Sequence, residues 1–318
     1  MRRRGPDPSS VRLPGPWAHR AVSANGIRLH VAECDGGGPL VVLVHGFAEF
    51  WWAWRHQLTA LAEHGYRAVA VDLRGYGDSD KPPRGYDLWT LAGDVAGLVR
   101  ALGEPRAHLV GHGWGGLVGW TVAAVHPRLV ESLAVLGAPH PLAVRRAVLR
   151  DPRGQGRAIA RHVLGLQLPR WPERSLVADD AARVERILRD RSGPEWAASA
   201  DFTEAVRCYR TAFQVPGVAH CAAEYHRWAV RSQFRAEGRR FAAAVARPAE
   251  VPVLALHGER DPWVLARTAA ASRRWVVGEH RVEVLSGVGH FPHQERPDAT
   301  TRLLTAFLPG GRAREPGS

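Results

Sequence analysis

Cysteine and lysine are scarce in this chain of 318 residues. The three cysteines, Cys34, Cys208 and Cys221, lie far apart. Their number and spacing exclude a disulfide framework and a zinc motif, and they fit a reducing compartment, so we expect a cytoplasmic protein. Because Lys81 is the only lysine, nearly all of the positive charge comes from arginine.

The net charge of +12 raises the question of nucleic-acid binding. Such binding needs a dense basic patch on one face or along one helix. The arginines are scattered instead, and no cluster stands out beyond Arg2, Arg3 and Arg4. We therefore interpret the charge as an arginine-rich solvated surface and expect no nucleic-acid partner.

Long apolar runs are absent as well. None reaches the roughly 18 residues that span a bilayer, and the basic start is followed by Gly5-Pro6-Asp7 rather than by the apolar core of a signal peptide. We expect neither a membrane segment nor export. The sequence also lacks a phosphate loop, a metal-ligand cluster and a dinucleotide-binding glycine pattern, so we expect no cofactor and no metal.

Short apolar runs and helical patterns alternate along most of the chain, beginning with a hairpin signal at Asn25-Gly26. This alternation predicts an α/β fold with a mostly parallel sheet and helices on both faces. The expected strands are Ala18–Ser23, Ile27–Ala32, Leu40–Val44, Arg67–Val71, Ala107–Val110, Leu133–Leu136, Val253–Leu256 and Val282–Leu285. The expected helices of the core are Trp52–Glu63, Leu88–Leu102, Gly115–Val125, Leu265–Trp275 and, after the last strand, Ala299–Phe307.

The alternation stops after Pro139-His140-Pro141 and resumes at Val253. We expect residues 17–141 and 247–308 to form the core, and residues 142–246 to form an inserted helical cap. Such a cap would cover the carboxyl ends of the strands, where open α/β sheets bind ligands. The ends of the chain, residues 1–16 and 309–318, are predicted to be disordered. The expected cap helices are Val177–Arg189, Phe202–Phe213 and Ala222–Arg235.

The run from Leu109 to Gly116 has the layout of a nucleophile elbow, in which an apolar strand passes through a glycine-flanked turn into a helix. The centre of such a turn normally carries Ser, Cys or Asp. Here it carries Gly113, which has no side chain and cannot attack a substrate. His112 is adjacent, but neighbours on a sharp turn point in different directions, so it is a poor substitute.

Three strand ends carry residues that suit catalysis. His45-Gly46-Phe47 follows one strand, and its N–H groups, with that of Trp114, could form an oxyanion hole. Asp261 follows the next, where a carboxylate can orient an imidazole. His290 follows the last, in a glycine-rich loop that suits a general base. The order elbow, acid and histidine is that of α/β-hydrolases.

Specific motifs lie at His45–Gln57, Asp72–Pro82, Ala138–Pro141 and Gly289–Phe291. Together they closely resemble α/β-hydrolases of the epoxide-hydrolase type, near relatives of haloalkane dehalogenases, over residues 17 to 308. In that family an elbow Asp attacks an epoxide carbon, a histidine activates the water that cleaves the ester, and two cap tyrosines hold the epoxide oxygen. The resemblance implies that His290 is the base, Asp261 its partner, Phe47 and Trp114 the oxyanion-hole residues, and Tyr225 one cap tyrosine.

The chain departs from the family in two places. Gly113 stands where the family has the attacking Asp, and the cap stretch 165–169, which matches the region of the other tyrosine, contains no Tyr. The aromatic residues near the strand-end loops indicate an apolar ligand pocket, and we expect Tyr225 and Trp52 to contact the substrate.

Three functions remain open from the sequence. The first is hydrolysis of a small apolar substrate by water that His290 and Asp261 activate directly, in the space that the missing side chain leaves. The second is a catalytically inactive protein that binds a small molecule or a partner. The third is a cofactor-free lyase or oxygenase, since such chemistry can use a His–Asp pair without a nucleophile. The oligomeric state stays open.

Overall fold

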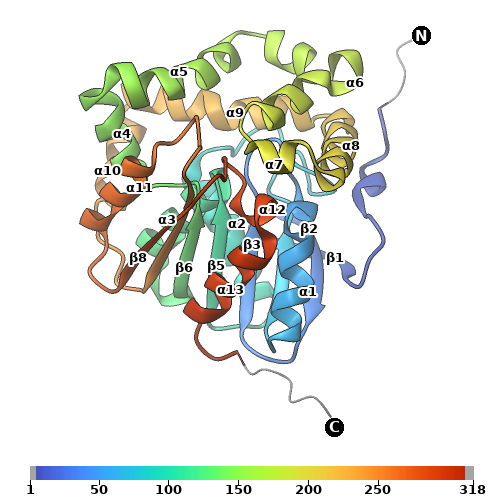
Figure 1. Ribbon diagram of the computed structural model, residues 1–318, viewed down its shortest axis with the longest axis vertical. Helices are drawn as coiled ribbons and strands as arrows, with labels where there is room; N and C mark the ends of the chain where they lie inside the picture. Colours follow the sequence, from blue (N-terminus) through green and yellow to red (C-terminus); the bar gives the residue numbers. More distant parts are fainter. Residues whose placement is uncertain (1–4, 312–318) are drawn as a thin grey trace.

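A computed structural model describes residues 5–311 as one sheet flanked by helices (Figure 1). The strand order is β1-β2-β4-β3-β5-β6-β7-β8. The pairs β1–β2 and β2–β4 are antiparallel and the other pairs are parallel, so the predicted mostly parallel sheet is confirmed. The strands are β1 (Ala18–Ala24), β2 (Ile27–Asp35), β3 (Leu40–Val44), β4 (Arg67–Val71), β5 (Ala107–His112), β6 (Val130–Leu136), β7 (Val253–Gly258) and β8 (His280–Leu285).

The central strands are buried because both faces of the sheet are covered. Every residue of β3 and β5 is buried, as expected for apolar parallel strands between two helix layers. In Figure 1, α1 and α13 lie in front of the sheet, and α2 and α3 lie behind it. The core helices are α1 (Arg55–Glu63), α2 (Leu88–Ala101), α3 (Trp114–Val125), α11 (Ala266–Ala270), α12 (Pro292–Glu295) and α13 (Pro297–Phe307).

The strand register lines up the loops that carry the site. Val44 pairs with Gly111, which brings the end of β3 beside the end of β5. Leu136 of β6 pairs in turn with Leu256 of β7, and Gly258 pairs with Leu285 of β8. The loops that follow these strands therefore meet along one edge of the sheet.

Between β6 and β7 the described chain forms helices and turns, which we call the cap segment (residues 141–246). Figure 1 shows α5, α6, α8 and α9 lying across the upper end of the sheet. One of them, α6, is interrupted where residues 179–181 adopt left-handed backbone angles. The helices are α4 (Pro141–Arg150), α5 (Arg157–Val163), α6 (Trp171–Arg189), α7 (Pro194–Ala197), α8 (Ala200–Gln214), α9 (Val218–Arg231) and α10 (Ala236–Val245).

The start of the chain differs from the disorder that its composition predicts for residues 1–16. Residues 1–4 lie outside the described residues, but Pro8–Val11 forms a 3-10 helix. Val11 is buried, and its carbonyl accepts a hydrogen bond from the Trp51 indole N–H at 2.9 Å. A buried apolar anchor thus fixes a segment that proline and arginine content alone predicts to be unfolded. Of the predicted disordered tail, residues 312–318 also lie outside the described residues.

No helix within residues 5–311 is long and apolar enough to cross a membrane.

Candidate active site

The turn between β5 and α3 has the backbone of a nucleophile elbow. Gly113 precedes α3 with φ +50° and ψ −114°, angles that residues with a side chain rarely adopt. A Cβ added there would lie 3.6 Å from the Gly46 Cα and 3.7 Å from His290 Nε2, which are ordinary contact distances. The position would therefore hold a small side chain facing His290, although glycine occupies it.

His290 and Asp261 lie together, as their positions at the ends of two neighbouring strands predict. His290 Nδ1 lies 2.6 Å from Asp261 Oδ2, and both side chains are buried. The other oxygen, Oδ1, accepts backbone N–H groups from Trp263 and Val264 at 2.8 and 2.9 Å. With Nδ1–H donating to the carboxylate, Nε2 carries the lone pair, and it is Nε2 that faces Gly113.

Burial sets the protonation state of this pair. It lowers the pKa of His290 to about 4, although the Asp261 carboxylate opposes the shift. Burial also disfavours the charged carboxylate, but the contacts with His290 and the two backbone donors hold the pKa of Asp261 below its usual value. At neutral pH the pair is therefore a neutral imidazole beside a carboxylate, as a general base requires.

The loop after β3 lies against the elbow, where an oxyanion hole would form. The Gly46 N–H donates to Glu49 Oε2 at 2.8 Å, and the next residue, Phe47, is buried. Trp114 begins α3, and N–H groups in a first helical turn have no acceptor within their own helix. These features keep Phe47 and Trp114 as the candidates for binding an oxyanion.

His112 is engaged on both ring nitrogens and is not positioned to act as a nucleophile. Its Nδ1 lies 2.6 Å from Glu49 Oε2, and its Nε2 lies 2.8 Å from the His290 carbonyl oxygen. Burial opposes a charge on the ring, but the Glu49 carboxylate raises the pKa of His112 above its usual value. The pair of His112 and Glu49 supports the loops on which Gly46 and His290 lie.

Only one group of side chains among residues 5–311 is close enough to hold a metal ion. One ligand atom each from Glu49, His112 and His293 lies within 4.8 Å of the others, and all three residues are buried. Both Glu49 oxygens already accept hydrogen bonds, from Gly46, His112 and Gln294. An ion would have to displace this network, so the donor set fits a buried hydrogen-bonded cluster better than a metal centre.

The two predicted substrate-binding aromatics, Tyr225 and Trp52, do not line the cavity at the elbow. Tyr225 is buried, and its hydroxyl donates to the Arg74 carbonyl oxygen at 2.7 Å, so this hydroxyl is not free to hold a substrate oxygen. Trp52 packs under the Arg55 guanidinium, whose carbon lies 3.9 Å from the ring centre, and it does not line the cavity at Gly113. The predicted substrate contacts of Tyr225 and Trp52 therefore stay predictions.

A small apolar cavity of about 140 Å³ opens beside the elbow. The core contributes Gly113, Trp114 and the loop 137–139, and the cap segment contributes Ile159, Val163 and His226. This lining agrees with the apolar pocket that the aromatic loops predict. The cavity is the natural place for a ligand next to His290.

The cap side of the site contains two histidines that the sequence analysis missed. His226 directly follows Tyr225 on α9, and its Nε2 lies 3.0 Å from the Trp114 indole nitrogen and 2.9 Å from His162 Nε2. Burial lowers the pKa of His226 to about 3, and burial together with the charge of Arg191 lowers the pKa of His162 as well. In the sequence, His226 could have been noticed only as the residue next to the predicted cap tyrosine, Tyr225. No local sequence pattern marks His162 as a site residue.

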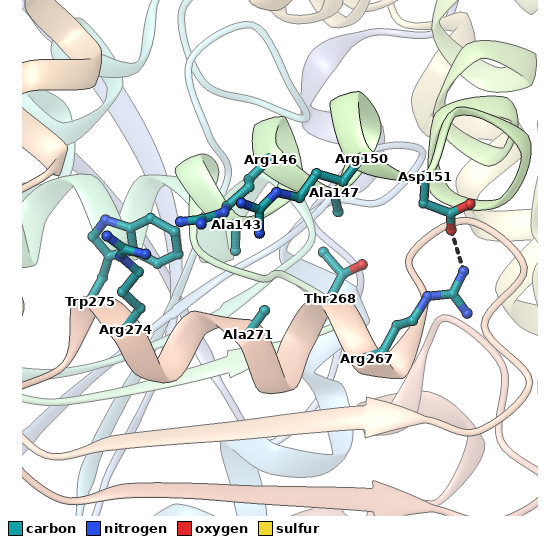
Figure 2. Close-up of a pocket in the computed structure, with 10 residues that line it drawn as sticks. All are labelled: Ala143, Arg146, Ala147, Arg150, Asp151, Arg267, Thr268, Ala271, Arg274 and Trp275. Carbon is teal, nitrogen blue, oxygen red and sulfur yellow. Dashed lines mark hydrogen bonds and ion pairs between the residues drawn. The ribbon is translucent and has the colours of Figure 1, made fainter.

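A larger cavity, of about 440 Å³, lies between α4 and the segment that follows β7 (Figure 2). Figure 2 shows Arg146 and Arg150 on one side and Arg274 on the other, with Asp151 paired to Arg267. None of the predicted site residues lines it. Although this cavity is the larger of the two, the residues that line it do not identify it as the active site.

Comparison with known proteins identifies the class. The family model described as alpha/beta hydrolase fold matches residues 39–297, so the chain belongs to the α/β-hydrolase family. Within that family it groups with the epoxide hydrolases. It is 31% identical to Epoxide hydrolase 4 of Mus musculus over 298 residues, which cover 92% of this chain and 80% of that protein. It is 34% identical to Epoxide hydrolase 3 of Xenopus tropicalis over 301 residues, covering 92% and 78% of the two chains.

Solved structures agree with this grouping. An epoxide hydrolase from an endophytic Streptomyces superposes with a TM-score of 0.78 at 31% identity, covering 93% of this chain and 96% of that one. Epoxide Hydrolase A from Mycobacterium thermoresistibile gives a TM-score of 0.75 at 29% identity, with coverage of 92% and 98%. The chain is thus an epoxide-hydrolase-like α/β-hydrolase.

Proposed function

We propose that this protein hydrolyses a small apolar substrate by direct attack of water that His290 and Asp261 activate. The observation that carries the proposal is the free Nε2 of His290. No group within residues 5–311 hydrogen-bonds to it, and it lies 3.7 Å from the point where a side chain of Gly113 would begin. A water in that space would have the base beside it and the apolar cavity in front of it.

The reaction then needs no bond between substrate and protein. The Nε2 lone pair takes a proton from water as the oxygen attacks, and Asp261 stabilises the imidazolium that forms. We expect the N–H groups of Phe47 and Trp114 to stabilise the negative charge that develops on an ester or epoxide oxygen. As the C–O bond breaks, the imidazolium gives its proton to the leaving oxygen, which restores the neutral base. Hydrolases that lose a triad member keep only about 10³- to 10⁴-fold acceleration over water. The substrate is therefore expected to be reactive, such as a strained epoxide or an activated ester.

A panel of epoxides, haloalkanes and activated esters tests the proposal, with His290→Ala and Asp261→Asn beside the wild type. We expect turnover to be lost in His290→Ala. In Asp261→Asn we expect it to fall by at least about 10²-fold, because the imidazole loses its orienting carboxylate. His280→Ala is the matched control, since His280 begins β8 at the opposite end of that strand from the site. Turnover that persists unchanged in His290→Ala would contradict the proposal.

The pH profile supplies a second signature. Because the pKa of His290 is lowered to about 4, the base stays unprotonated down to that pH. The rate should hold from neutral pH to about pH 5 and fall as the pH drops through about 4, since an imidazolium cannot accept a proton. An acid limb near the ordinary histidine value of about 6.5 would mean that a different group acts as the base.

One observation favours the second candidate, a ligand-binding protein without catalysis. The hydroxyl of Tyr225 is bound to the Arg74 carbonyl, so the cap tyrosine implied by the family resemblance is not available to polarise an epoxide. Tight binding of apolar ligands without turnover, equal in the wild type and in His290→Ala, would support this function instead.

A further inference from the structure

Arg191 differs from every other buried arginine in the described part of the chain. Four arginine side chains are buried there, and three have a carboxylate partner. Arg55 pairs with Asp201, Arg74 with Asp94, and Arg227 with Glu173. Arg191 is only 7% exposed, and no carboxylate within residues 5–311 forms an ion pair with it, although Asp261 and Asp190 act on it from farther away. A buried cation without a counter-ion is costly, so this one requires an explanation.

The guanidinium also keeps donor hydrogens without an acceptor. Its Nη2 donates to His162 Nδ1, but its buried Nη1 makes no hydrogen bond. The Trp263 ring lies under the guanidinium, 4.5 Å from its central carbon, and the buried Trp263 indole N–H is unpaired as well. Two unmatched donor groups thus lie together around one positive charge.

These donors border the proposed reaction site. The centres of the Trp263 and His290 rings are 4.9 Å apart, and the backbone of Arg191 accepts the His290 N–H at 2.7 Å. Trp263 lines the apolar cavity beside Gly113 and also a groove of about 420 Å³, which Arg191, His162 and Asp190 line as well. The Trp263 ring is therefore shared by the apolar cavity and by a groove that contains the buried charge of Arg191.

The hydrogen-bond pattern keeps the neighbouring histidines neutral, so they add no second positive charge beside Arg191. His226 Nδ1 donates to the Ala222 carbonyl, and His226 Nε2 accepts from the Trp114 indole N–H. The same Nε2 faces His162 Nε2–H, while His162 Nδ1 accepts from Arg191. Each ring donates once and carries no charge. Asp261 and Asp190 act on Arg191 only from beyond ion-pair distance, so its guanidinium has no direct anionic partner among the described residues.

We propose that the site binds an organic carboxylate, with its anionic end on Arg191 and Trp263 and its apolar body in the cavity beside Gly113. A carboxylate matches the planar guanidinium and accepts several N–H donors at once, which makes such contacts stronger than those of neutral groups. The inference rests on the proposed function only in placing the ligand in the same cavity. It narrows the substrate class from small apolar molecules to apolar acids.

Binding, rather than turnover, tests this inference. Isothermal titration calorimetry is run with ω-phenyl acids from phenylacetate to 5-phenylpentanoate, each beside its carboxamide, which keeps the shape and removes the charge. In the wild type we expect at least one acid to bind about tenfold or more tightly than its amide, the effect of one charged hydrogen-bonded contact. Arg191→Gln should abolish this preference, and Arg191→Lys should retain part of it.

Arg183→Gln is the matched control. Arg183 lines the same groove but donates to Ser175 and stacks on Trp171, so its loss should leave the preference for acids intact. Circular dichroism checks that each variant folds. If Arg191→Gln does not fold, the comparison of acid and amide is made with Arg191→Lys instead. Equal affinity for acid and amide at every chain length, or a preference that survives Arg191→Gln, would overturn the inference.

The two proposals fail in different ways. His290→Ala should keep the preference for acids, because the base is not needed for binding. Failure of the proposed function would leave acid binding without any turnover. Failure of this inference would leave turnover of neutral substrates without a preference for acids.

Discussion

Restoring a carboxylate at the elbow is the most direct test of the vacant site. The Cβ of Gly113→Asp would lie 3.7 Å from His290 Nε2 and 3.6 Å from the Gly46 Cα, so the first atom of the side chain fits without a clash. If the site around it is otherwise complete, the variant gains a covalent route. The carboxylate attacks the substrate carbon, and His290 then activates water to cleave the ester.

The expected gain follows from what the vacant site lacks. A hydrolase without its nucleophile retains about 10³- to 10⁴-fold acceleration, whereas complete enzymes reach at least about 10⁶-fold. Gly113→Asp should therefore raise the rate on an alkylating substrate by about 10²- to 10³-fold. The backbone angles at this residue disfavour a side chain by about 1–3 kcal/mol. The N-terminus of α3 offsets about 0.3–1 kcal/mol of that strain by attracting the carboxylate.

Single turnovers in ¹⁸O-labelled water separate the two routes. With enzyme in excess, direct water attack in the wild type puts solvent oxygen into the product of the first turnover. In Gly113→Asp the first product should carry unlabelled oxygen from the side chain, and mass spectrometry should detect an ester on the peptide that contains residue 113. Gly113→Ala has the same backbone strain without a carboxylate and should show neither effect.

The reasoning is refuted if Gly113→Asp folds yet forms no ester and is no faster than Gly113→Ala. Its free energy of unfolding, measured in urea, should lie within about 3 kcal/mol of the wild-type value, as the backbone strain predicts. A folded, unreactive variant would mean that the Nε2 of His290 does not face the elbow in the working protein. An ester found on the same loop in the wild type would refute the direct-water mechanism instead.

Two further predictions concern stability. Burial lowers the pKa values of His140 and His226 to about 3, so below about pH 6.5 the unfolded chain binds protons on these residues and the folded protein does not. The free energy of unfolding should therefore be highest above about pH 6.5 and fall by about 1.4 kcal/mol per pH unit for each of the two residues down to about pH 3. Urea unfolding at pH 8, 6 and 5 measures this decline, and its absence would contradict the prediction. Tyr225→Phe removes the hydrogen bond to the Arg74 carbonyl and should cost about 1 kcal/mol of stability with little change in kcat/KM, whereas a large loss of activity with unchanged stability would restore the tyrosine to the catalytic site.

The core of the fold could be predicted because its signals are local. Apolar runs such as Leu40–Val44, bounded by turn residues, identify buried strands, and the matched registers of β3, β5 and β7 bring their ends together. Strand-end position therefore indicated Asp261 and His290, whose side chains lie 2.6 Å apart. The distance between the two side chains depends only on which loops follow which strands. The motifs of a single sequence were therefore sufficient to predict that Asp261 and His290 meet.

The cap side could not be predicted in the same way. Consecutive residues on a helix point about 100° apart, so an offset of one position brings His226 rather than Tyr225 to the cavity. Helical periodicity marks α9 as amphipathic but does not say which of its buried residues faces the site. Arg191 is one of many arginines, and only the packing of its loop against His290 shows that this one is buried and unpaired.

The pair of Asp261 and His290 is itself an argument that the site is used. A buried ionisable pair contributes little to stability compared with apolar side chains of similar volume, because burial of the carboxylate has to be offset by its partner. Here Asp261 accepts hydrogen bonds from two backbone N–H groups and one imidazole, an arrangement that fixes the histidine tautomer and leaves Nε2 facing Gly113. Two apolar side chains at these positions would stabilise the fold equally well. The geometry is instead that of a base kept ready beside a space the size of a small side chain, and Gly113 provides that space without backbone strain.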